Sequence, residues 1–258
     1  MSHVDSDQPE STPTWIDLDV PDPGRARDFY GALFGWTFET GTGAAAGHTT
    51  CLLRGRAVAG FRPAPAPDPA PGLWRVYFAT RDCDSTARRV VDAGGSLTHG
   101  PVDLGDRGRL ALATDSVGAR FGLWEGRAHP GCRTVNEPGS LVRNDLTTPR
   151  PGPARDFYTA LFGFTLDGNE DLPGFDFTFL RRPDGHEIGG VFGDPGAPVS
   201  AWQTTFEVAD TDASVERAVA AGGAAAAPTD SPYGRYAEIT DPFGTAFSVI
   251  ARPPAQAE

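Results

Sequence analysis

The sequence contains no lysine and no long apolar run, and these absences exclude several classes of protein. All 22 basic residues are arginine, and 34 acidic residues give a formal net charge of −12. A net-acidic chain without a basic cluster is poorly suited to bind nucleic acid or an anionic membrane. No apolar run approaches the ~20 residues that a membrane-spanning helix requires. We therefore expect neither a nucleic-acid partner nor a membrane partner.

Cysteine is also scarce, and its spacing excludes two kinds of structural support. The three cysteines, Cys51, Cys83 and Cys132, are odd in number and far apart. They therefore predict neither a disulfide framework nor a paired zinc motif. The N-terminal segment MSHVDSDQPESTPT is polar and acidic, and it lacks the apolar core of a secretory signal. Both observations favour a reducing compartment, so we expect a cytoplasmic protein.

What the sequence does contain is an internal repeat. Residues 18–36 read LDVPDPGRARDFYGALFGW, and residues 146–164 read LTTPRPGPARDFYTALFGF, at an offset of 128 positions. The offset becomes 126 positions by Asp115 and Asp241. One two-residue gap therefore aligns two halves of about 125 residues each, a common size for one domain.

Each half contains a weaker repeat of about 60 residues, which is a period expected for one supersecondary unit. Each unit is predicted to be a strand, a helix and then three short strands. In the first unit, the segment 15–20 alternates apolar and other residues, as a half-buried strand does. A helix then begins after Asp22 and ends at Gly35, and its apolar face carries Ala26, Phe29, Tyr30, Leu33 and Phe34.

The repeat also predicts the domain boundaries. We expect a disordered tail over 1–12, a first domain over 13–126 with units 13–62 and 73–126, a linker over 127–139, a second domain over 140–252 with units 140–193 and 200–252, and a tail over 253–258. The residues leave open whether the units pair within a half or across the two halves.

The duplicated pattern L-x-V-x-D-x-x-x-A-x-x-F-Y-x-x-x-F-G-W, followed by a Gly-Arg strand and D-x-x-G-A, resembles the vicinal oxygen chelate superfamily. This is the glyoxalase, bleomycin-resistance and extradiol-dioxygenase group, and the resemblance runs twice, from Thr14 to about Ala251. More closely, GLWEGRAHPGCRTVNEPGSLVRNDL resembles tandem-domain mycobacterial culture-filtrate antigens and actinomycete homologues called hydroxylases. The resemblance implies an α+β fold, in which four βαβββ units form two domains. Each domain would be a curved, cup-shaped mixed sheet with helices outside and a ligand in the cup.

Metalloenzymes of this superfamily hold a divalent ion with His, Gln or Glu on the first and last strands of each unit. The matching positions here are Trp15, Arg75, Arg143 and Gln203 on first strands, and Gly60, Gly122, Gly190 and Ser248 on last strands. Only Gln203 could coordinate an ion, and one ligand does not make a site. The adjacent residues His186 and Glu187 would point to opposite faces of a strand. We therefore expect no metal site and no cofactor.

The same register predicts which side chains point into the cups. The candidate ligand-binding residues are Trp15, Arg75, Tyr77, Arg120, Trp124, Arg143, Gln203, Glu207 and Ser248, and Asp19, Thr147, Thr205 and Ile250 share their faces. Indole, phenol and guanidinium groups suit a planar aromatic ligand that carries hydroxyl or carboxylate groups. The matched carboxylates Asp17 and Asp145 are candidate general bases, or else structural partners of Arg75, Arg143 or Arg235.

These features support a metal-free protein that binds or sequesters a hydrophobic, aromatic, natural-product-like molecule. One alternative is a metal-independent tailoring enzyme, a hydroxylase, isomerase or lyase, with Asp17 or Asp145 as base and Arg75 or Tyr77 as oxyanion partner. Another is a glyoxalase-like detoxification enzyme. The partner is expected to be a small metabolite, and the chain a monomer or a homodimer.

Overall fold

A computed structural model describes residues 3–41, 47–64, 72–168 and 174–253. The first half contains β1 (Pro13–Val20), α1 (Pro23–Phe34), β2 (Thr37–Thr40), β3 (Thr49–Leu53), β4 (Arg56–Pro63), β5 (Arg75–Ala79), α2 (Cys83–Asp92), β6 (Ser96–Asp103), β7 (Gly108–Thr114) and β8 (Arg120–Gly126). The second half contains β9 (Leu141–Thr148), α3 (Pro151–Phe162), β10 (Thr165–Gly168), β11 (Asp176–Arg181), β12 (Glu187–Gly193), β13 (Ala201–Glu207), α4 (Thr211–Ala220), β14 (Ala224–Ala225), β15 (Thr229–Ser231), β16 (Gly234–Thr240) and β17 (Ala246–Ala251). The expected tail over 253–258 lies almost entirely outside the described residues.

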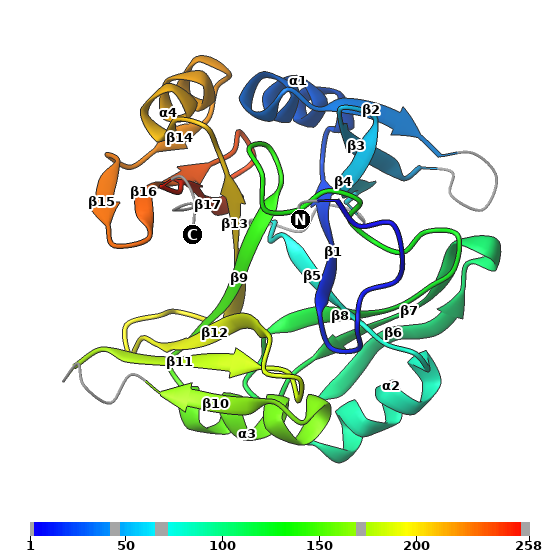
Figure 1. Cartoon of the computed structure of the whole chain (residues 1–258). Coiled ribbons are helices and arrows are strands. Elements are labelled where there is room, and N and C mark those ends of the chain that lie inside the picture. Colours follow the sequence, from blue (N-terminus) through cyan, green and yellow to red (C-terminus); the bar gives the residue numbers. More distant parts are fainter. Residues whose placement is uncertain (1–2, 42–46, 65–71, 169–173, 254–258) are drawn as a thin grey trace.

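The strands form two mixed sheets, one from each half of the repeat (Figure 1). The order is β2-β3-β4-β1-β5-β8-β7-β6 in the first sheet and β10-β11-β12-β9-β13-β17-β16-β14 in the second. The two units of a half therefore join through β1 and β5, or through β9 and β13, which run antiparallel. The α+β fold of four βαβββ units is confirmed, and the pairing that the sequence left open occurs within each half.

The local signals in the sequence determine the helix ends. The Asp22 side chain accepts hydrogen bonds from the backbone amides of Gly24 and Arg25 at the start of α1. Gly35 ends α1 in a left-handed conformation with φ of 72°, which glycine adopts without steric cost. All five residues of the predicted apolar face are buried. The amphipathic pattern therefore places α1 correctly against its sheet.

The hydrophobic cores extend across the two halves. One cluster joins β1 and α1 to β13, α4 and β17, and includes Leu33, Trp74, Phe206 and Phe247. A second cluster joins α2 and β8 to α3 and β9, and includes Phe121 and Phe157. Accordingly, α1 lies beside α4 and α2 lies beside α3 (Figure 1). Each sheet is thus formed within one half, while the hydrophobic core between the sheets and helices is shared by both halves.

The segment before β1 and the linker between the halves lie against the first sheet. The Val4 amide donates to the Arg133 carbonyl, and the Cys132 amide donates to the Thr14 carbonyl. The Ser11 amide donates to the carbonyl of Ala79, the last residue of β5. Where the sequence predicted a disordered tail over 1–12, residues 3–12 make contacts with the linker and with the end of β5. These contacts determine how accessible the first sheet is.

Candidate functional site

The candidate site residues lie on the face of each sheet that is turned away from the helices, here called the inner face. In the first sheet, Asp17 lies beside Gly60 and Arg75 in adjacent strands. In the second sheet, Asp145 lies beside Gly190 and Gln203 in the same way. Because paired residues point to the same side of a sheet, the register puts each predicted set on one face. What each face can bind depends on what covers it.

On the first inner face, Asp17 is held inside a network of partners. The Tyr77 hydroxyl donates to one carboxylate oxygen at 2.6 Å, and Arg75 donates to the other at 3.0 Å. Arg75 also binds Asp19, and Arg62 lies 3.5 Å from Asp17. Burial works against the charged form of Arg75, but the neighbouring Asp17 raises its pKa overall. The predicted base and its predicted oxyanion partners therefore satisfy one another.

The linker covers this same face. The imidazole of His129 lies edge-on to the indole of Trp15, with ring centroids 4.5 Å apart, and its carbonyl accepts from the Trp124 indole N–H. Trp15, Tyr77, Trp124 and Cys132 form a buried apolar cluster. The cavity that remains measures only about 50 Å³. A cavity of roughly 150 Å³ is known to hold a single benzene ring, so this space is too small for an aromatic ligand.

Trp15, Arg75, Tyr77 and Trp124 therefore do lie together. Their side chains pack against one another and the linker, and so occupy the space above the first inner face. Arg120, also predicted to bind a ligand, is exposed at the start of β8. These residues could contact a ligand there only if the linker moved away.

The second inner face carries a group of phenylalanines that the first lacks. Phe175, Phe177, Phe179 and Phe192 lie side by side, with neighbouring ring centroids 4.9–6.1 Å apart. Phe175 is 46% exposed, and the other three are partly exposed. Exposed, contiguous aromatic rings on a sheet commonly mark a surface that binds a partner. We call these four residues the phenylalanine cluster.

Arg143 connects this cluster to the predicted carboxylate. Its guanidinium lies 5.6 Å from the ring centroids of both Phe177 and Phe179, a cation–π geometry. The same group donates to Asp145 at 2.7 Å and to Glu187 at 2.7 Å. Burial raises the pKa of the Asp145 carboxyl, and the charge of Arg143 opposes that rise. Aromatic, cationic and carboxylate groups thus converge on one half-exposed surface.

The remaining predicted residues of the second half lie on the neighbouring strands of this face. Gln203 lies beside Asp145, and Ser248 lies beside Thr205. Glu207 forms an ion pair with Arg252, which directly follows β17. Gln203 therefore borders Asp145, Ser248 lies one strand further away, and Glu207 has a separate structural partner.

The donor set does not fit the divalent ion that the fold family implies. A side chain added at Gly122 would meet the Tyr77 ring at 2.1 Å, and one at Gly190 would meet the Phe177 ring at 2.3 Å. At Gly60 it would meet the Trp15 indole at 3.0 Å. Within the described ranges, no three His, Cys, Asp or Glu residues are grouped as a metal site would require. Aromatic rings therefore lie where last-strand ligands would project.

Sequence reasoning missed the phenylalanine cluster, although the signal was present. Phe175, Phe177 and Phe179 alternate in GFDFTFL, so they share one face of a strand. The motif positions directed attention to the first and last strands of each unit, whereas β11 is an intermediate strand. Phe192 lies opposite Phe177 on β12 and joins the group only through strand pairing.

Family models match both halves of the chain. The model described as Glyoxalase/Bleomycin resistance protein/Dioxygenase superfamily matches residues 140–249, and the Glyoxalase-like domain matches residues 15–124. The two matches, the repeated βαβββ units and the two sheets agree. The fold defines a tandem protein of the vicinal oxygen chelate type. The chain belongs to the glyoxalase/bleomycin resistance protein/dioxygenase superfamily.

Two relatives are similar over almost the whole chain. CFP32 of Mycobacterium tuberculosis, whose name carries the word glyoxylase, is 38% identical over 259 residues, covering 97% of this chain and 98% of that protein. The anthracycline biosynthesis protein DnrV of Streptomyces peucetius is 36% identical over 254 residues, covering 92% of each.

Solved structures share the fold at low sequence identity. The Mn(II)-bound glyoxalase from Novosphingobium aromaticivorans has a TM-score of 0.66 at 17% identity, covering 93% of this chain and 83% of that chain. The 2,2',3-trihydroxybiphenyl 1,2-dioxygenase from Sphingomonas wittichii RW1 has a TM-score of 0.62 at 14% identity, covering 94% and 91%. Among the described helices, none combines the length and the apolar character needed to cross a membrane.

Proposed function

We propose that this protein binds a planar aromatic small molecule on the inner face of its second sheet, without a metal ion. The phenylalanine cluster supplies apolar ring surface. The Arg143 guanidinium, already paired with Asp145 and Glu187, keeps further N–H groups that can bind a hydroxyl or quinone oxygen. Offset stacking and cation–π contacts each contribute about 0.5–2 kcal/mol in favourable cases. Several such contacts together give useful affinity for a flat ligand.

The observation that carries the proposal is the difference between the two inner faces. At the register positions of Phe177, Phe179 and Phe192, the first sheet has His48, Thr50 and Arg62. In the first half the aromatic rings lie on central strands and are buried under the linker. In the second half they lie on outer strands and are partly exposed. An apolar group that the fold does not require, left in contact with solvent, points to a ligand.

The relatives support the ligand class. DnrV carries anthracycline biosynthesis in its name, and anthracyclines are built on a planar aromatic ring system. A binding or sequestering role in the biosynthesis of, or resistance to, such a natural product fits a surface of rings beside one arginine. The absence of a fitting donor set at the superfamily's metal positions supports binding without a metal.

Titration of a fluorescent anthracycline with the full chain tests this proposal. We expect saturable quenching or polarisation, and a Kd at least ten-fold weaker in the double variant Phe177→Ala/Phe179→Ala. The matched control is Thr50→Ala, which truncates the register equivalent of Phe179 in the first sheet and should leave Kd unchanged. Equal affinity in all three proteins would refute the assignment to the second inner face.

A metal-independent tailoring enzyme is the second candidate function. Asp145 is its candidate general base. Burial raises the pKa of Asp145, as a general base requires, and its side chain is 24% exposed. Incubation with the aromatic probe followed by mass spectrometry would detect a product. If turnover occurs, Asp145→Asn should abolish it while binding persists. Binding with no product in the wild-type chain would support a purely binding role.

A further inference from the structure

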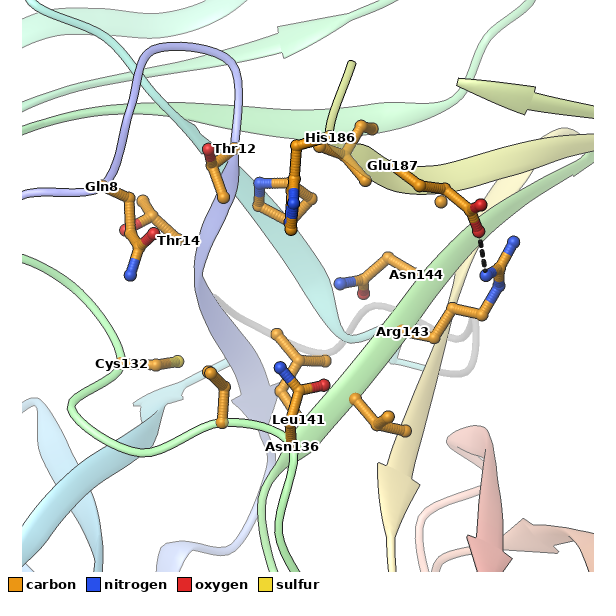
Figure 2. A pocket seen from close by; sticks show the side chains of 15 residues that line it. Gln8, Thr12, Thr14, Cys132, Asn136, Leu141, Arg143, Asn144, His186 and Glu187 are labelled. Atoms are coloured by element: carbon orange, nitrogen blue, oxygen red, sulfur yellow. Dashed lines mark hydrogen bonds and ion pairs between the residues drawn. The ribbon is translucent and has the colours of Figure 1, made fainter. Parts of the chain in front are cut away.

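We propose that a cavity between the two halves binds a small neutral molecule that carries a carbonyl group, such as a lactam or a carboxamide. The cavity measures about 280 Å³ and lies between β1, the linker, β9 and β12 (Figure 2). Pockets for drug-sized ligands span roughly 300–1,000 Å³, so this one suits a smaller molecule. It shares Arg143 and Glu187 with the surface around the phenylalanine cluster, but the four phenylalanines do not line it.

Asn144 is the residue that gives this cavity its chemistry. It is only 2% exposed, and its amide oxygen accepts a hydrogen bond from the Thr204 hydroxyl at 3.0 Å. Its amide nitrogen is turned into the cavity (Figure 2), where no side chain in the described ranges accepts from it. Because this nitrogen borders the cavity, its N–H groups are accessible to a molecule inside it. A carbonyl oxygen in the cavity would supply an acceptor.

The internal repeat shows that the fold does not require this polar pair. In the first half, the positions of Asn144 and Thr204 are occupied by Ile16 and Val76, and the two pairs lie at the same strand register. Ile16 and Val76 are fully buried in the hydrophobic core. The second half therefore has a hydrogen-bonding pair where its counterpart has an apolar one. A polar pair that the fold does not need is typical of a binding site.

The lining of the cavity favours a neutral ligand. Gln8, Thr12 and Asn136 contribute uncharged polar groups, while the walls are completed by Leu141 and Ile188, among others. The two charged residues at its border, Arg143 and Glu187, neutralise each other in an ion pair at 2.7 Å (Figure 2). Apart from the His186 imidazole, a charged ligand would meet no unpaired charge among the lining residues. A small amide would combine apolar contact with hydrogen bonds in both directions.

The geometry separates this site from the second inner face. Asn144 and Asp145 are consecutive in β9, so their side chains point to opposite faces. His186, just before β12, and Glu187, the first residue of β12, diverge in the same manner: His186 points into the cavity and Glu187 toward Arg143 (Figure 2). The inference therefore stands whether or not an aromatic molecule binds at the phenylalanine cluster.

Protein-observed NMR of the full chain, with 2-piperidone as the probe, tests the inference. The side-chain amide signals of Asn144 are identified as the pair that disappears in Asn144→Asp. We expect 2-piperidone to shift this pair saturably, while acetate and methylammonium at equal concentration leave it in place. No saturable shift with 2-piperidone in the wild-type chain would overturn the proposal.

The matched variant is Asn144→Ile/Thr204→Val, which rebuilds the first-half pair in the second half. We expect it to keep or raise the melting temperature and to weaken 2-piperidone binding at least ten-fold, read from backbone amides around the cavity. Asn144→Asp, which keeps the size but removes the donor, should lose binding equally. Unchanged binding in either variant would also overturn the proposal. Anthracycline affinity measured in parallel should be the same in all three proteins, so failure at one site is distinguishable from failure at the other.

Discussion

The phenol of Tyr30 in the first half donates a hydrogen bond to the carboxylate of Asp241 in the second half, at 3.0 Å. The repeat duplicates this contact, because Tyr158 donates to Asp115 at 3.0 Å in the opposite direction. All four residues are buried. Two reciprocal hydrogen bonds therefore connect the halves within their buried cores. We expect the halves to unfold together.

Removal of either hydroxyl should destabilise the chain, and unequally. Tyr158 also accepts a hydrogen bond from the Trp202 indole at 2.8 Å, whereas the equivalent Trp74 indole N–H has no partner in the described structure. Tyr158→Phe therefore leaves two groups unsatisfied and should cost about 2–4 kcal/mol of unfolding free energy, while Tyr30→Phe should cost about 1–2 kcal/mol. Urea unfolding measures both, and equal losses would contradict the asymmetry.

Asp17 and Asp145 should contribute unequally to the free energy of unfolding. Asp17 is buried and binds Tyr77 and Arg75, so Asp17→Asn leaves a buried guanidinium partly unpaired and should cost about 3 kcal/mol. Asp145 and Arg143 are partly exposed, and Arg143 keeps Glu187 as a partner, so Asp145→Asn should cost below about 1 kcal/mol. Thermal and urea unfolding of the two variants test this order. A larger loss for Asp145→Asn would show that the second carboxylate is the structural one.

Acid should destabilise the packing of the linker residue His129 on the first inner face. Burial, with Arg107 and Arg133 nearby, lowers the pKa of His129 to about 4. The unfolded chain therefore binds more protons than the folded chain between pH 6.5 and 4, so stability falls as pH falls through this window. The loss attributable to His129 approaches about 3 kcal/mol at pH 4.

His129→Phe separates this effect from general acid destabilisation. Phenylalanine can still pack against Trp15 and Trp124 but does not titrate. We expect the variant to flatten the pH dependence of urea unfolding between pH 6.5 and 4, with tryptophan emission as the probe. An identical pH profile in both proteins would rule out His129 as the titrating group.

Divalent metal should neither bind stoichiometrically nor stabilise the chain. The positions from which relatives would supply ligands carry indole, guanidinium, amide, hydroxyl or no side chain, and rings cover three of the glycines. We expect elemental analysis to find no stoichiometric metal, and Mn²⁺, Zn²⁺ or Ni²⁺ to leave the melting temperature of chelator-treated protein unchanged. One tightly held ion per chain would support the glyoxalase-like alternative instead.

Strand periodicity in the sequence is enough to place most of the candidate site residues on their faces. Alternation from Trp15 puts Asp17 and Asp19 on one face, and the same rule places Arg143 with Asp145. Periodicity does not single out Phe177 and Phe179, because their importance comes from pairing with β12 and from exposure. Neither property can be read from one strand.

The sequence by itself determined the repeat, the helices and strands, their apolar faces and the face of each candidate residue on the first and last strands. These follow from short-range periodicity and capping, which act over a few residues. The tertiary structure alone decided that units pair within halves, that cores are shared between halves, and that the linker covers one inner face while leaving the other exposed. The physical reason is that burial depends on contacts between segments far apart in the chain, such as His129 with Trp15, and local composition does not specify them.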